Sequence, residues 1–178
     1  MYPTGAWIPH FIGRHPLRDW AEATGSLTRK LQAVSSQFNV VLLHQGPQEP
    51  FHDQRQVCQL PQHGRAMTRE VLLRDGDTTL VYAHSVTALS ALNGAWHHLN
   101  GLGNRPLGEA LFTDPLVQRM PLHHCKINRQ HPLYQRARSQ ATGVLDWPPQ
   151  LLARRSVFMR NNTPLLVTEV FLPALMQR

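Results

Sequence analysis

The sequence is poor in cysteine and lacks any long apolar run. Cys58 and Cys125 are the only cysteines among 178 residues, and their spacing matches no disulfide framework, so we expect two free thiols in a reducing compartment. No stretch approaches the ~20 apolar residues of a membrane span. The first 16 residues also lack the charged segment and apolar run of a signal peptide. These absences together predict a cytoplasmic protein without a membrane span.

Acidic residues are scarce as well, and this gives the chain a marked positive charge. Eleven Asp and Glu face 18 Lys and Arg, for a net charge of +7, and lysine occurs only at positions 30 and 126. Arginine therefore supplies most of the charge, and its planar guanidinium suits carboxylate or phosphate. The basic stretch 119–138 offers only Tyr134 for stacking on bases, so we expect a small anionic ligand and no nucleic acid.

Histidine is abundant, with eleven residues, but it forms no metal-binding pattern. The clusters His97-His98 and His123-His124-Cys125 lack zinc-ligand spacing, so we predict no metal. The stretch "GLGNRPLG" does not fit a dinucleotide fingerprint. Its N–H groups could hold an anion where "PLGEALF" starts a helix, although a plain connecting loop is equally consistent with the spacing. No G-x-S-x-G elbow is present to support serine hydrolase chemistry.

Length and a hydrophobic content of 42% predict one domain over residues 1–178. Residues 1–16, rich in proline and glycine, are expected to form an irregular arm. Helical spacing follows, with Gly25 as a break and Ser26 or Thr28 as the cap of a second helix. The other expected elements are a strand from 38 that ends at a Gly-Pro turn, strand and loop at 51–66, helical stretches at 87–99 and 106–112, and a long basic loop region at 115–151 with a short helix at 132–141.

Two β-hairpins, at 67–86 and 152–173, are the clearest elements. Both consist of β-rich runs around a turn signal, which is Asp75-Gly76 in the first and Asn161-Asn162 in the second. Two hairpins and a few helices predict an α+β fold built on an antiparallel sheet.

Each hairpin carries one charged residue in an apolar setting. Alternation along "PLLVTEVFLP" places Glu169 on a strand face whose other side chains are apolar, and Arg69 has the same position in "MTREVLL". A buried charge costs several kcal/mol unless a partner pairs with it or a carboxylate stays protonated. We therefore predict that Arg69 and Glu169 belong to one polar pocket inside the sheet, with an ordinary buried salt bridge as the alternative.

Five stretches together resemble the chorismate pyruvate-lyase family, also called 4-hydroxybenzoate synthase. In order, they are "SLTRKL" (26–31), "TREVLLRDG" (68–76), "RPLGEALF" (105–112), "ARRSVF" (153–158) and "PLLVTEVFLP" (164–173). The resemblance implies a single antiparallel sheet flanked by helices, an enclosed ligand pocket, no cofactor and a monomer. It also implies conversion of chorismate to 4-hydroxybenzoate and pyruvate, the first committed step of ubiquinone biosynthesis.

The resemblance also assigns roles to individual residues. It implies that Arg69, together with main-chain N–H groups of Leu107 and Leu27, binds the ring carboxylate. Glu169 then meets the ring hydroxyl at the far end, so that Arg69 and Glu169 are the expected catalytic pair. Chorismate is a dianion, and an arginine-rich protein with an apolar pocket suits it.

Two departures from the family pattern are visible. His84 stands where the family commonly has arginine, and that arginine would help with the second carboxylate or with ligand entry; Arg154 or Arg155 could compensate. Segment 119–150 is also longer than in compact family members. The alternative to an enzyme is a non-catalytic sensor domain of the same fold that binds a small aromatic acid.

Overall fold

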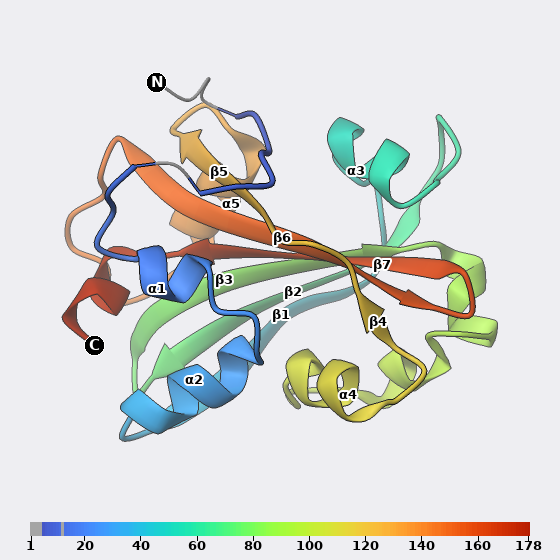
Figure 1. Cartoon of the computed structure of the whole chain (residues 1–178), viewed down its shortest axis with the longest axis horizontal. Coiled ribbons are helices and arrows are strands. Elements are labelled where there is room, and N and C mark those ends of the chain that lie inside the picture. The colour runs from blue at the N-terminus through green and yellow to red at the C-terminus, as the bar shows by residue number, and fades with distance from the viewer. Residues whose placement is uncertain (1–4, 12) are drawn as a thin grey trace.

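A single antiparallel sheet of seven strands forms the centre of the protein (Figure 1). The computed structural model describes residues 5–11 and 13–178. The strand order is β1-β2-β3-β7-β6-β4, with β5 also paired to β6. The strands are β1 (Phe38–Gln48), β2 (Ala66–Asp75), β3 (Thr78–Thr87), β4 (Gln118–Arg119), β5 (His123–Asn128), β6 (Gln150–Arg160) and β7 (Thr163–Phe171). The α+β prediction is confirmed.

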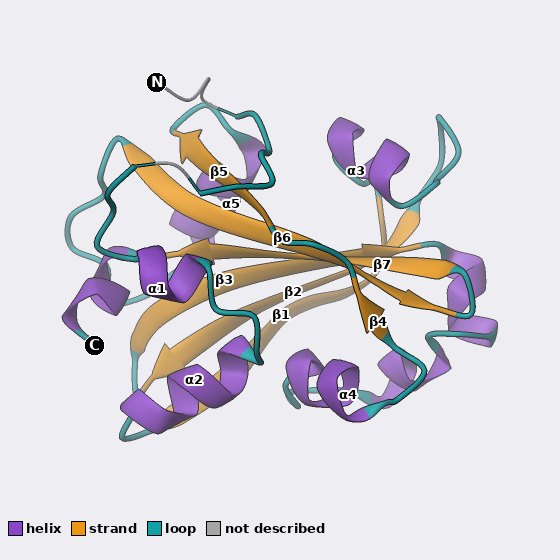
Figure 2. Cartoon of the chain, viewed as in Figure 1, coloured by secondary structure: helices purple, strands orange, loops and turns teal. Residues whose placement is uncertain are grey.

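Short helices flank the sheet on both sides (Figure 2). The α-helices are α1 (Arg18–Ala21), α2 (Leu27–Val34), α3 (His52–Val57), α4 (Leu107–Thr113) and α5 (Pro132–Gln140). Three 3-10 helices add η1 (Leu89–Asn93), η2 (His97–Gly101) and η3 (Pro173–Gln177). Within the described residues, none of these helices is long and apolar enough to cross a bilayer.

Both predicted hairpins form. The second turns at Asn161-Asn162 as expected, whereas the first turns at Gly76 and Asp77, one residue beyond the expected Asp75-Gly76, because Asp75 still pairs with Thr78. Gly76 follows β2 with φ +57°, a left-handed conformation that glycine adopts without strain. Asn161 and Asn162 join β6 to β7 with φ +47° and +57°, which asparagine tolerates better than most residues. Each hairpin therefore closes where a residue able to adopt positive φ stands between two β-rich runs.

Strand alternation separates the two faces of the sheet. On one face, a row crosses the sheet through Arg69, Ser85 and Val167, and the next row passes through Ala83 and Glu169. Residues between these positions point to the opposite face. Helices α2 and α4 lie on one side of the sheet in Figure 1, and α3 lies on the other.

Three details of the expected element pattern are wrong. β1 does not end at the Gly-Pro turn but continues through Gly46 and Pro47, as the edge strand beside β2. Proline is tolerated on an edge strand. Segment 51–66, expected as strand and loop, begins with helix α3.

The third correction concerns 115–151, which is less of a loop than expected. Helix α5 confirms the short helix near 132–141, but β4 and β5 were not expected. Most residues of β5 are polar, and the segment forms a strand because it pairs with β6. The pairing runs from His123 opposite Arg155 to Asn128 opposite Gln150.

The N-terminal arm is irregular where the structure describes it. Its only β-type contact in the described part is an isolated bridge from Ile8 to His124 of β5. The expectation for residues 1–4 and 12 lies outside the described residues.

Candidate functional site

A cavity lies between one face of the sheet and helices α2 and α4. Its lining includes all four residues assigned to the ligand from the sequence: Leu27, Arg69, Leu107 and Glu169. Arg69 comes from β2 and Glu169 from β7, with only β3 between them. Strand spacing and rise place their Cα atoms roughly 12 Å apart across the sheet. The tertiary structure thus brings together residues that lie a hundred positions apart in the sequence.

Arg69 is held rigidly at one end of this cavity. It is only 4% exposed. Its Nη1 donates to Oε1 of Gln45 at 2.6 Å, and its Nη2 donates to the carbonyl of Arg105 at 3.1 Å. Burial lowers the pKa of Arg69 to about 10, so the guanidinium stays charged at neutral pH. No carboxylate pairs with it within the described residues, and its buried Nε has no acceptor.

Two helices begin at residues that line the same cavity as Arg69. Leu27 is the first residue of α2 and Leu107 the first of α4. The first N–H groups of a helix have no intrahelical acceptor and carry partial positive charge. Ser26 caps α2, with its hydroxyl accepting from the N–H of Arg29, which confirms one of the two predicted caps.

The two helix starts approach each other closely at Gly108. A Cβ atom at this position would lie 3.2 Å from Oγ1 of Thr28 and 3.3 Å from Oγ of Ser26. This spacing is tighter than ordinary van der Waals contact. Glycine at this position therefore allows the starts of α2 and α4 to pack closely together beside the cavity that Arg69 also lines, and helix starts next to a guanidinium suit a carboxylate.

Glu169, at the other end of the cavity, is paired. Its Oε2 accepts from Nε of Arg154 at 2.5 Å, and its side chain is 15% exposed. Its other oxygen has no hydrogen-bond partner within the described residues, and Glu169 contributes to the cavity lining. The carboxylate that the sequence left unexplained on an apolar strand face is thus compensated by a neighbouring arginine, and one oxygen remains available to a ligand.

Arg154 acts as the anchor for this end of the site. It is fully buried, and its Nη1 donates to the carbonyl oxygens of Trp20, Ala21 and Ala23 at the end of α1. Carbonyls at a helix end carry partial negative charge. Arg154 therefore positions Glu169 and already has its hydrogen-bonding capacity largely occupied.

Sequence reasoning missed one cationic residue of the cavity, Arg119. It lies on β4, which pairs with β6 opposite Phe158. Its guanidinium stacks on the rings of Phe112 and Phe158, at 5.6 and 5.5 Å from the ring centroids. Burial lowers the pKa of Arg119 to about 10. In the sequence, Arg119 is one arginine in a polar stretch, and this pattern is the same as for an arginine on the protein surface.

The walls between these charged groups are largely apolar. The side chains that form them are Val71, Leu73, Ala83, Leu111, Phe112, Phe158 and Val167. Flat apolar walls with a few polar groups at the ends fit a small ring-shaped acid.

His84 does not belong to this cavity. Its neighbours Ala83 and Ser85 line the cavity, so His84 points to the opposite face of the sheet. The expectation that this position serves the second carboxylate is therefore wrong for this chain. Arg155 also lies on that opposite face, where it pairs with Asp53 at 2.7 Å, and it cannot compensate in the cavity.

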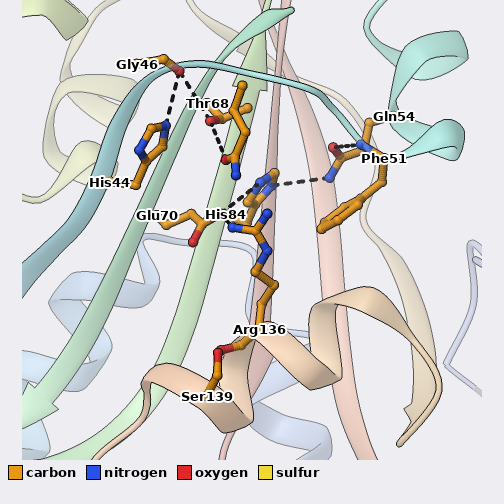
Figure 3. Close-up of polar contacts among 10 residues, drawn as sticks. His44, Gly46, Phe51, Gln54, Thr68, Glu70, His84, Arg136 and Ser139 are labelled. Atoms are coloured by element: carbon orange, nitrogen blue, oxygen red, sulfur yellow. Dashed lines mark hydrogen bonds and ion pairs between the residues drawn. The ribbon is translucent and has the colours of Figure 1, made fainter.

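Figure 3 shows the polar cluster that surrounds His84 instead. Nη1 of Arg136 on α5 donates to Glu70 at 2.7 Å, and Glu70 is 3.7 Å from Nε2 of His84. Gln54 of α3 contacts Nδ1 of His84 at 3.2 Å, and the ring of Phe51 stacks on the histidine. This cluster attaches α3 and α5 to the face of the sheet opposite the cavity.

Neither face offers a metal centre in the described part of the chain. No group of three or more His, Cys, Asp or Glu side chains there is close enough to hold an ion. Cys58 and Cys125 are both buried and unpaired, as expected for free thiols.

The chorismate lyase family model matches residues 13–178. The chain belongs to the chorismate lyase family. It is 41% identical over 174 residues to a protein named "Probable chorismate pyruvate-lyase" from Nitrosomonas europaea, and the alignment covers 97% of this chain and 96% of that protein. A protein of the same name from Thiobacillus denitrificans is 42% identical over 96% of this chain and 90% of its own length. The predicted family and lyase class are therefore confirmed.

Solved structures of other proteins share this fold. The chain aligns with the PhnF C-terminal domain at a TM-score of 0.56 and 13% identity, covering 85% of this chain and 93% of that one. The C-terminal domain of the histidine utilization repressor from Pseudomonas syringae gives 0.53 and 8% identity, covering 78% and 93%. At such low identity these likenesses show only that this chorismate lyase family member shares its fold with those domains.

Proposed function

We propose that this protein removes pyruvate from chorismate to give 4-hydroxybenzoate, and that this reaction is the first committed step toward ubiquinone. The main support is that one cavity holds both a buried guanidinium without a carboxylate partner in the described residues and, at its other end, a carboxylate with one oxygen not bound to Arg154. A para-substituted acid places its polar groups at opposite ends of a ring, and the cavity does the same.

The end with Arg69 receives the ring carboxylate. The guanidinium is charged, desolvated and free of carboxylate partners in the described structure, so a ligand carboxylate would form a strong charge-assisted contact with it. The main-chain N–H groups of Leu27 and Leu107 complete the site from the two helix starts. Binding at this end orients the ring along the cavity.

The end with Glu169 receives the ring hydroxyl. We propose an elimination in which the hydrogen on the hydroxyl-bearing carbon leaves while the neighbouring ether C–O bond breaks. The ring gains its third double bond, and the enolpyruvyl group gains a proton on its methylene to become pyruvate. The protein contributes by holding the ether and the C–H bond in a reactive pose, away from water.

A direct assay tests this proposal. Purified protein incubated with chorismate should release 4-hydroxybenzoate and pyruvate in equal amounts. Binding of 4-hydroxybenzoate without turnover of chorismate would instead favour a sensor or carrier of the same fold.

An isotope experiment then follows the proton. Chorismate carrying deuterium on the hydroxyl-bearing carbon is converted in ordinary water, and the pyruvate methyl group is analysed by mass spectrometry. Deuterium in the methyl group would show direct transfer within the substrate. Its absence would show that the transferred proton comes from solvent, as expected for transfer through a solvent-equilibrated carboxylate such as Glu169.

A further inference from the structure

We propose that Arg119 binds the enolpyruvyl carboxylate of the substrate, and so distinguishes the dianionic substrate from the monoanionic aromatic product. This inference rests on the proposed function and adds a residue that sequence reasoning did not assign. The argument depends on the position of Arg119, on its lack of a carboxylate partner and on the second charge of chorismate.

Arg119 lies at the end of the cavity where this second carboxylate must be. In chorismate the enolpyruvyl ether is on the carbon next to the one that bears the hydroxyl. If Glu169 meets the hydroxyl, the enolpyruvyl carboxylate lies near Glu169. Nη1 of Arg119 donates to the carbonyl of Thr24 at 2.6 Å, and Nη1 of Arg154, the partner of Glu169, donates to the adjacent carbonyl of Ala23 at 2.7 Å. The Arg119 guanidinium therefore lies close to this ion pair, and all three side chains line the cavity.

The other charged side chains of the cavity have a partner or a proposed one, whereas Arg119 has no anionic partner in the described residues. Arg154 pairs with Glu169, and Arg69 has the ring carboxylate as its proposed partner. Arg119 makes no ion pair within the described residues. Its buried Nε has no acceptor, an unusual and costly state for a polar group. A substrate carboxylate would supply the missing acceptor.

The guanidinium is held in a fixed position by its other contacts. Its Nη1 donates to the carbonyl of Thr24 at 2.6 Å, and two phenylalanine rings, Phe112 and Phe158, lie against it. A preorganised cation loses little entropy when a carboxylate binds. The hydrogen bond to Thr24 also links Arg119 to the segment between α1 and α2.

Arg119 also stands between the cavity and the outside. It lines the cavity and, in addition, an open surface groove formed with Pro9, Glu22, Met120 and His124. A carboxylate bound at Arg119 is therefore close to a route out of the site. Pyruvate, which is released with this carboxylate, could leave through that groove while the aromatic product stays in the cavity.

The test compares substrate and product binding in matched variants. Arg119→Met keeps an apolar chain between the two phenylalanine rings but removes the charge. We expect the KM for chorismate to rise about 10- to 100-fold, as for the loss of a charge-assisted hydrogen bond. The Kd for 4-hydroxybenzoate, measured by calorimetry, should change less than about 3-fold on the same basis. Arg119→Lys should recover part of the substrate affinity.

Arg69→Met serves as the comparison, because this substitution should lower the affinity for substrate and product alike. If Arg119→Met lowers the affinity for substrate and product equally, Arg119 only supports the shape of the cavity. If the KM for chorismate is unchanged, Arg119 does not contact the substrate. Either result overturns the proposal. If the wild-type protein fails to turn over chorismate, the proposed function is wrong. The affinity of each variant for chorismate, measured by equilibrium binding, then still tests Arg119.

Discussion

Arg69 is the residue on which ligand affinity should depend most. A buried arginine that donates only to an amide and a main-chain carbonyl is incompletely compensated. Its rigid position makes it a preformed partner for a carboxylate.

We expect Arg69→Ala to weaken 4-hydroxybenzoate binding at least about 30-fold, since a charge-assisted contact of ~2 kcal/mol is lost. Titration calorimetry measures the change. Arg74→Ala is the matched control, because this arginine is on the same strand but pairs with Asp77 at the hairpin turn. Similar affinity in Arg69→Ala and the wild type would remove Arg69 from the ligand site.

Gly108 allows a second test at the residue scale. In a helix, alanine is favoured over glycine by about 1 kcal/mol, so Gly108→Ala should not unfold the protein. The added methyl group should instead push α4 away from Thr28 and Ser26 and displace the N–H of Leu107. We expect weaker 4-hydroxybenzoate binding with little change in Tm. Gly101→Ala, where no atom is near the added methyl, provides the control; equal affinities in the two variants would argue against a carboxylate site at the helix starts.

At the scale of elements, the sheet separates two polar systems. The cavity face carries the proposed ligand-binding groups, whereas charged residues on the opposite face attach helices to the sheet. Glu70 is nearly buried, at 4% side-chain exposure, and depends on Arg136 of α5. The second system is structural because it connects α5 and α3 to β2 and β3 through direct contacts.

Removing the ion pair between Arg136 of α5 and Glu70 should therefore lower the free energy of unfolding without changing ligand affinity. Arg136→Met leaves the carboxylate of Glu70 buried without its cation, and we expect a loss of about 2 to 3 kcal/mol, at the low end for a buried pair because Arg136 is partly exposed. Urea unfolding measures this loss. Arg138→Met, two residues along and exposed on the same helix, should change stability by less than about 0.5 kcal/mol. Equal effects of the two substitutions would contradict the prediction that Arg136 attaches α5 to the sheet through Glu70.

At the scale of the whole molecule, buried histidines make stability depend on pH. Burial, with the nearby charges of Arg136 and His44, lowers the pKa of His84 to about 3 from an ordinary 6.5. Glu70 is near but already neutralised by Arg136. Burial also lowers the pKa of His15, His98, His124 and His131. The unfolded chain binds more protons than the folded one below pH 6.5, so stability falls as the pH falls.

The contribution of His84 can be isolated. Lowering the pH from 7 to 5 should reduce the free energy of unfolding by about 2 kcal/mol through His84 alone. The free energy of unfolding of His84→Gln should therefore fall by about 2 kcal/mol less than that of the wild type over the same interval. Denaturant unfolding at both pH values measures the difference. His52→Gln, at an exposed position of α3, should behave like the wild type. A His84→Gln variant as acid-sensitive as the wild type would show that His84 is not buried in its neutral form.

The sequence by itself determined the two hairpins, the Asn161-Asn162 turn and the apolar faces around Arg69 and Glu169, and it narrowed the cap of α2 to Ser26 or Thr28, because each follows from neighbouring residues. Alternation and turn propensity act over a few positions and are visible in one chain. The resemblance in five stretches also predicted four ligand positions, and the structure places all four in the lining of one cavity.

Only the tertiary structure decided the place of β5, the partner of Glu169, the face of His84 and the presence of Arg119 in the cavity. β5 is polar and becomes a strand because β6 offers it hydrogen bonds. Arg119 reaches the cavity because β4 pairs with the same strand. Such pairings join residues far apart in sequence, and the free energy that selects them comes from burial and hydrogen bonding in the assembled fold, which local patterns do not contain.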